Sequence, residues 1–182
     1  MTEGNILPAG AYVRPLQMHS DDRGCFTEIF RNSWSDGALP VQWNAVSSRT
    51  GVLRGVHVHA DHDDVLVVVQ GCAIIGLHDI RRESPTFGLA CTLDLRGAAQ
   101  SALFVPRGVA HGFYFPEDSL MVYAVNTYWD SSDETGCHWA DPKLGIAWGI
   151  ERAITSPRDS HAGGFDDMCQ NFALKAEANR IA

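Results

Sequence analysis

Lysine is almost absent from this sequence of 182 residues, because only Lys143 and Lys175 occur among its fourteen basic residues. Acidic residues number 22, which gives a formal net charge of -8 at pH 7. A chain with this balance and no basic stripe is a poor partner for nucleic acid or for an anionic membrane surface. We therefore expect any anion to be bound by arginine, histidine or backbone amides.

The cysteines form no C-x-x-C pair and are odd in number: Cys25, Cys72, Cys91, Cys137 and Cys169. No secretory segment is visible, and no apolar run approaches the roughly 20 residues that a membrane-spanning helix needs. This pattern predicts reduced thiols in a cytoplasmic protein. No internal repeat, low-complexity segment or linker is present, so we expect a single domain over residues 1–182.

Short runs rich in β-branched and aromatic residues follow one another along the chain, separated by turn signals roughly every 8 to 12 residues. The pattern predicts strands over residues 11–16, 25–30, 40–48, 65–69, 72–79, 89–95, 101–105, 113–115 and 120–129. This succession favours an all-β sandwich or barrel. Helix formers with a plausible period occur only over 171–182, so we expect residues 165–182 to be a short helical or irregular tail.

The stretch from Gly51 to Gly71 holds three histidines and three aspartates beside a run of strand-forming residues. Val65 to Val69 is a continuous apolar run of strand length, which is typical of a strand buried on both faces. His57 and His59 alternate with valines, so a strand would turn both imidazoles to one face. We expect that face to line a site inside the barrel, whereas His62 is expected in a solvated turn.

Two motifs in this region resemble the signatures of the cupin superfamily. Residues 51–71 fit G-x5-H-x-H-x4-D-x6-G, with aspartate in place of the usual glutamate, and residues 106–111 fit P-x-G-x-x-H. The resemblance implies a double-stranded β-helix, also called a jelly roll. In metal-binding cupins the matching positions are metal ligands, here His57, His59, Asp64 and His111. Imidazole and carboxylate suit a divalent transition metal, so one prediction is a metal-dependent isomerase or dioxygenase.

A second and longer series of motifs covers residues 12–162. It comprises D-D-R-G-C-F-T-E from Asp21, Q-W-N-A-V-S-S from Gln42, G-V-L-R-G-V-H from Gly51, R-R-E-S-P-T-F-G from Arg81, P-R-G-V-A-H-G-F from Pro106, N-T-Y-W from Asn126, W-A-D-P-K-L-G-I-A-W from Trp139 and S-P-R-D from Ser156. The series resembles dTDP-4-dehydrorhamnose 3,5-epimerases, a metal-free branch of the cupins. It implies an isomerase that acts on a dTDP-linked 4-keto-6-deoxy hexose without a cofactor.

The resemblance also assigns roles by position. His57 matches the general base, Asp159 the carboxylate that orients it, and Tyr128 the acid on the opposite face of the sugar. The substrate-binding positions are Arg23, Phe26, Glu28, Gln42, Asn44, Arg54 and His111. The family implies a homodimer in which the N-terminal strands within residues 1–30 contribute to the neighbouring subunit.

This chemistry suits the residue types themselves. A proton next to a ketone can be removed when the enolate is stabilised, and a histidine held by a carboxylate can remove it near neutral pH. The chain departs from the family pattern at three positions. Asp64 stands where a lysine is usual, Ala124 follows Tyr123 where another lysine is usual, and His59 replaces a glutamine. Three alternatives follow: a divalent metal supplies the electrophile, Arg54 and His111 stabilise the enolate, or the chain is a catalytically silent sugar-nucleotide binding relative.

Overall fold

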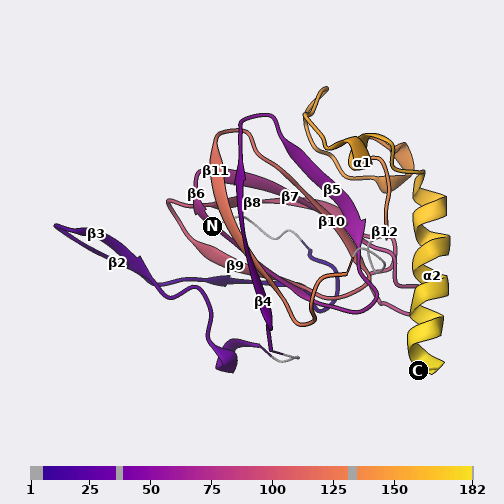
Figure 1. The fold of residues 1–182 in the computed structure, drawn as a ribbon, viewed down its shortest axis with the longest axis horizontal. Helices are drawn as coiled ribbons and strands as arrows, with labels where there is room; N and C mark the ends of the chain where they lie inside the picture. Colours follow the sequence, from indigo (N-terminus) through magenta and orange to yellow (C-terminus); the bar gives the residue numbers. More distant parts are fainter. Residues whose placement is uncertain (1–5, 36–38, 131–134, 182) are drawn as a thin grey trace.

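The computed structural model describes residues 6–35, 39–130 and 135–181. Two five-stranded antiparallel sheets pack face to face, and a two-stranded hairpin projects from them (Figure 1). The first sheet has the order β1-β9-β6-β11-β4 and the second the order β12-β5-β10-β7-β8. The strands are β1 (Tyr12–Pro15), β2 (Met18–Asp21), β3 (Gly24–Thr27), β4 (Gln42–Ser48), β5 (Leu53–Val58), β6 (Asp64–Gln70), β7 (Cys72–Asp79), β8 (Ala90–Arg96), β9 (Ser101–Val105), β10 (Val109–Tyr114), β11 (Ser119–Val125) and β12 (Thr135–Gly136).

Strand β6 lies in the middle of the first sheet and is buried on both faces, as its apolar run predicts. Leu66 and Val68 face the second sheet, where they join a cluster that also contains Ile75 and Leu77 of β7. Val65 and Val67 face the other way and are covered by residues from the N-terminal segment. Because side chains alternate along a strand, β6 packs against the second sheet with one face and against the N-terminal segment with the other.

The outer face of the second sheet is covered by the C-terminal part of the chain. Val56 and Val58 of β5 pack there against Trp148 and Met168. The covering segments are the 3-10 helix η2 (Pro142–Leu144), the short helix α1 (Pro157–Ser160) and the helix α2 (Phe165–Ile181). A further 3-10 turn, η1 (Asn32–Trp34), lies in the N-terminal segment.

The segment expected at the C-terminus, residues 165–182, is helical over Phe165–Ile181, and this helix is longer than the run of helix formers indicated. It begins at Phe165, six residues before the run of helix formers, and spans 17 residues. The backbone N–H of Phe165 donates to the Asp141 carboxylate at 2.9 Å, so a residue distant in sequence satisfies one of the unpaired donors at the start of the helix. Met168 has no exposed surface. The helix is therefore packed against the sheet through its first turns instead of lying loose.

The predicted all-β jelly-roll architecture is confirmed. Strand β1 pairs with β9 of the same chain at the edge of the first sheet. The hairpin of β2 and β3 extends away from the body, on the side opposite α2 (Figure 1). Among the described residues, no helix combines the length and hydrophobicity that crossing a bilayer requires.

Candidate active site

The S-P-R-D segment forms one turn of helix that presents Asp159 to strand β5. The Ser156 hydroxyl accepts a hydrogen bond from the Asp159 N–H at 3.1 Å, and Pro157 occupies the first helical position. Serine at the N-cap followed by proline is a strong helix-start signal. A parallel bridge between Val52 and Ile154 then holds the segment beside β5. These contacts fix the position of the Asp159 carboxylate.

His57 lies near the end of β5, and its Nε2 is 2.8 Å from Asp159 Oδ1. The second carboxylate oxygen accepts from the Gly55 N–H at 3.4 Å. The Asp159 side chain is only 5% exposed, whereas the His57 side chain is 18% exposed. A buried carboxylate thus orients an imidazole that retains contact with solvent. This is the arrangement of a general base with an orienting acid.

The Asp159 carboxylate is ionised at neutral pH. Burial alone would raise its pKa, but hydrogen bonds to His57, Ser156 and the Gly55 N–H together lower the pKa to about 2. An ionised Asp159 requires a donor at Nε2 of His57, and the lone pair of that tautomer lies on Nδ1. The negative charge also stabilises the imidazolium that forms when His57 accepts a proton.

Arg158 is a residue of this site that the sequence patterns did not predict. Its Nη2 lies 3.1 Å from His57 Nε2, and its Nε lies 3.4 Å from Asp159 Oδ1. The guanidinium therefore brings positive charge to the edge of the His57–Asp159 pair. Arg158 directly precedes Asp159 in the S-P-R-D motif, so this motif could have identified Arg158 as a residue of the site.

His111 lies on β10, directly opposite His57 in the strand pairing, so the two imidazoles share the inner face of the second sheet. Its Nδ1 is 3.0 Å from the Val109 carbonyl oxygen. The ring of His59 lies 5.4 Å from that of His111 and stacks on His62 at 4.0 Å. The prediction that His57 and His59 face a common interior site is consistent with these contacts.

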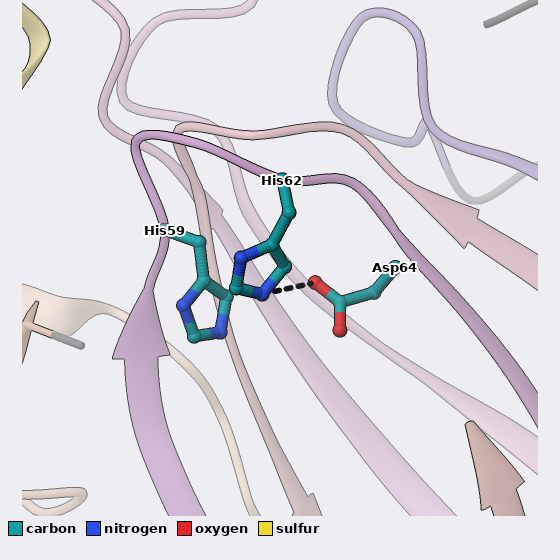
Figure 2. Close-up of side chains that lie close together, drawn as sticks. All are labelled: His59, His62 and Asp64. Atoms are coloured by element: carbon teal, nitrogen blue, oxygen red, sulfur yellow. Dashed lines mark ion pairs between the residues drawn. The ribbon is translucent and has the colours of Figure 1, made fainter. Parts of the chain in front are cut away.

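The expectation that His62 lies in a solvated turn is wrong. His62 is 2% exposed, and its Nε2 points toward the Asp64 carboxylate at 3.9 Å (Figure 2). The reason is a network that folds the loop inward. The Asp63 carboxylate accepts from the Arg107 N–H at 2.9 Å and from the Asn126 side-chain amide at 2.9 Å. The loop thereby carries His62 and Asp64 into the interior, while Asp61 stays exposed.

Burial controls the charge of the histidine cluster. Loss of solvent, with smaller contributions from the charges of His57 and His62, lowers the pKa of His111 to about 4, although the hydrogen bond to the Val109 carbonyl opposes this shift. Loss of solvent also lowers the pKa of His59 well below its ordinary value, with a further contribution from His111 and His62. Both rings are therefore neutral at pH 7.

Three predicted substrate-binding residues lie on β4 and β5. Gln42 donates to Asn44 Oδ1 at 3.0 Å and accepts from the Trp129 N–H at 2.9 Å. Arg54 donates from Nε to the Ser48 hydroxyl at 3.0 Å. Tyr128 follows β11 and is 78% exposed. Its role as the acid stays a prediction.

The remaining three predicted residues lie on or beside the projecting hairpin, away from strand β5, which carries His57 (Figure 1). Arg23 pairs with Asp21 at 2.5 Å, and Glu28 pairs with Arg31 at 2.5 Å. Phe26 is 65% exposed. A single chain does not bring these residues to the His57–Asp159 pair.

The comparisons with known proteins identify the family of this chain. A family model described as dTDP-4-dehydrorhamnose 3,5-epimerase matches residues 7–167. The chain belongs to this family. This match confirms the resemblance that was predicted from residues 12–162. It also confirms the predicted class of enzyme, an isomerase.

Curated relatives carry the same name. The dTDP-4-dehydrorhamnose 3,5-epimerase of Shigella flexneri is 30% identical over 160 residues, which cover 83% of this chain and 88% of that protein. The enzyme of that name from Neisseria gonorrhoeae is 34% identical over 161 residues, covering 84% of this chain. The matched region spans about half, 49%, of the length of the Neisseria protein.

A solved structure shows the fold of the epimerase family with a ligand. The dTDP-6-deoxy-D-glucose-3,5-epimerase of Legionella pneumophila, in complex with dTDP-4-keto-L-rhamnose, aligns with a TM-score of 0.80 at 30% identity. The alignment covers 89% of this chain and 93% of that chain. The comparisons give no support to the alternative prediction of a metal-dependent isomerase or dioxygenase.

Proposed function

We propose that this chain epimerises a dTDP-linked 4-keto-6-deoxy hexose at C3, C5 or both, by removing and returning a proton next to the ketone. The observation that carries the proposal is the 2.8 Å contact between His57 and the buried Asp159 in a chain of the epimerase family. A base of this kind suits abstraction of a carbon-bound proton near neutral pH.

The proposed reaction begins when His57 removes the proton alpha to the carbonyl. The electrons of the C–H bond form a C=C bond to the carbonyl carbon, and the π electrons of the carbonyl move to its oxygen, which gives the enolate. Asp159 stabilises the imidazolium, because it is ionised and hydrogen-bonded to Nε2. Arg158, within 3.1 Å of that nitrogen, places positive charge beside the His57–Asp159 pair.

Inversion then requires a proton from the opposite face of the sugar ring. Tyr128 is the proposed donor, and its phenol proton passes to the carbon as the carbonyl re-forms. A single base would return the original configuration unless the intermediate turned over. His57 and Tyr128 return to their starting states by exchange with solvent, so no cofactor is consumed.

Substrate binding is proposed to involve two chains. Gln42, Asn44, Arg54 and His111 belong to the chain that carries the base, whereas Arg23, Phe26 and Glu28 would come from the projecting hairpin of a second subunit. The hairpin's direction away from its own body supports this arrangement (Figure 1). A symmetric homodimer would then complete both sites. A cytoplasmic location stays a prediction carried by the odd number of cysteines.

The dimer part of the proposal can be tested by mixing two inactive variants. His57→Asn removes the base, and Arg23→Ala combined with Glu28→Ala alters the hairpin. If sites are shared, unfolding and refolding the two proteins together restores activity, because mixed dimers contain one intact site. Lack of recovery, with mixed dimers demonstrated by mass, would contradict a shared site.

The reaction itself can be tested in deuterium oxide. The protein is incubated with dTDP-4-keto-6-deoxy-D-glucose, and proton NMR follows the C3 and C5 positions. Loss of either signal with formation of an epimer supports the proposal and shows which carbon is inverted. Tight binding with no exchange at either carbon would favour a silent binding relative, and the proposed activity would be wrong.

A further inference from the structure

Gly136 lies opposite His57 in the pairing of β12 with β5 (Figure 1). Residues paired across two strands project their side chains from the same face of the sheet. A β-carbon at position 136 would lie 3.0 Å from Cδ2 of His57 and 2.6 Å from the Val56 carbonyl oxygen. Carbon atoms in van der Waals contact are about 3.5 to 4.0 Å apart. The imidazole therefore occupies space that a side chain at position 136 would fill.

The ring atom that lies nearest to Gly136 shows how the imidazole is turned. Cδ2 is bonded to Nε2, the nitrogen that lies 2.8 Å from Asp159 Oδ1. The ring edge that reaches the carboxylate is thus the edge beside Gly136. Nδ1 belongs to the opposite edge, which faces away from β12. When Nε2 donates to Asp159, the lone pair of the neutral ring is on Nδ1, so the opposite edge carries the basic atom.

Backbone hydrogen bonds hold β12 in place beside the imidazole. The Cys137 N–H donates to the Val56 carbonyl at 3.0 Å, and the Val56 N–H donates to the Cys137 carbonyl at 3.3 Å. Cys137 has no exposed surface and packs in the same cluster as Val56. A larger residue at position 136 must therefore separate the two strands or push the His57 ring off its partner carboxylate.

The carboxylate does not follow a displaced ring, because contacts of its own hold it. The Asp159 N–H donates to the Ser156 hydroxyl at 3.1 Å, and Asp159 Oδ2 accepts from the Gly55 N–H at 3.4 Å. Movement of the imidazole away from β12 therefore lengthens the contact between His57 and Asp159. The absence of a side chain at position 136 is thus a condition for this contact.

We propose that Gly136 is a positioning residue for the base: it leaves the space in which the His57 ring keeps Nε2 on Asp159 and turns Nδ1 toward the substrate. This inference rests on the proposed function, although the ring orientation can be measured without substrate. Gly136→Ala should lower kcat by about 100-fold, the effect of misplacing a reacting group by about 1 Å. KM should change little, because position 136 lies beside the ring edge that faces away from the substrate.

NMR of protein labelled with ¹⁵N-histidine, recorded above neutral pH, tests the ring orientation. Long-range proton–nitrogen correlations distinguish the two neutral tautomers, and His57→Asn identifies the His57 signals. Wild type should show the Nε2–H tautomer, whereas Gly136→Ala should show an average of both. The matched control Gly163→Ala should resemble wild type in tautomer and kcat, because Gly163 is exposed and a β-carbon there would first meet the Asp167 side chain, at 3.2 Å.

The wild-type tautomer in a folded Gly136→Ala protein would overturn the proposal. If wild type fails to epimerise any 4-keto sugar, the proposed function is wrong, but the tautomer measurement still tests the role of Gly136 in orienting the ring.

A cycle of melting temperatures covers the case in which Gly136→Ala folds poorly. A β-carbon at position 136 would contact both the ring and the Val56 carbonyl, and a His57→Ala background removes only the first contact. Gly136→Ala should therefore lower the melting temperature less in His57→Ala than in wild type, because the two positions are coupled. Equal lowering in both backgrounds, or failure of both proteins to fold, would show that the glycine serves strand pairing alone and would overturn the proposal.

Discussion

His57 and Asp159 are separated by 102 residues in the sequence, yet His57 Nε2 and Asp159 Oδ1 meet at 2.8 Å. The bridge between Val52 and Ile154 and the capped turn from Ser156 create this contact. The pair joins a buried acid to a partly exposed base, and the proposed chemistry depends on it.

Replacing Asp159 by Asn should lower kcat for epimerisation by about 10- to 1,000-fold, within the range that a positioned acid or base contributes. Asparagine can still accept a hydrogen bond, but it does not stabilise the imidazolium. Steady-state kinetics with the nucleotide sugar measure the effect, and KM should change little. Asp166→Asn, which removes an exposed carboxylate of α2, serves as the control. Equal rates for wild type and Asp159→Asn would contradict the assigned role.

The pKa of Asp159 also predicts how stability depends on pH. Its folded-state pKa of about 2 lies below the ordinary value of 3.8, so the unfolded chain binds the proton first as pH falls. The ionised group therefore stabilises the fold above pH 4, and this contribution, ~2 kcal/mol, is lost as pH falls toward 2.

Urea unfolding at several pH values tests this expectation. The difference in unfolding free energy between wild type and Asp159→Asn should shrink between pH 4 and pH 2. Other acids with lowered pKa, such as Asp79, contribute equally to both proteins and cancel in the difference. A difference that stays constant across this range would show that Asp159 is not ionised in the folded protein.

Tyr128→Phe should separate the two proton transfers. His57 can still remove the proton, so deuterium from solvent should continue to enter the sugar. Formation of the inverted product should fall by about 100- to 10,000-fold, because the acid on the opposite face is missing. NMR resolves exchange and inversion in one sample. Inversion at the wild-type rate would assign the acid to another residue.

Helix α2 should contribute to the stability of the whole domain. Met168→Ala is expected to lower the free energy of unfolding by about 2 to 5 kcal/mol, because it leaves a cavity under the helix. The matched control is Leu174→Ala, since Leu174 lies on the same helix and is 61% exposed. Its effect should stay within about 0.5 kcal/mol. Similar small effects for both variants would indicate that the helix is loosely attached.

Much of the sheet could be predicted from the sequence. Strands at 72–79 and 101–105 have the predicted bounds, because apolar runs between turn signals reflect burial directly. His57 was found by two independent motifs. Asp159 was found only through the family resemblance, because a turn residue brought to β5 by tertiary contacts leaves no local pattern.

The incorrect predictions share one physical cause, which is contact between residues that lie far apart in the sequence. His62 stands among aspartates that resemble a solvated turn, and contacts from Arg107 and Asn126, far along the chain, bury it. The start of α2 depends on a hydrogen bond from the Phe165 N–H to Asp141, which no pattern around residue 165 reveals. Local composition therefore predicted the strands well and the long-range polar contacts poorly.

The most direct measurement of the central claim is solvent deuterium incorporation by wild type and His57→Asn. Both proteins are incubated in deuterium oxide with the same dTDP-4-keto-6-deoxy sugar, and mass spectrometry follows the label over time. Wild type should incorporate deuterium at one or both carbons next to the ketone. His57→Asn should do so at least about 100-fold more slowly while still binding the nucleotide sugar. Equal rates of incorporation would show that His57 is not the base.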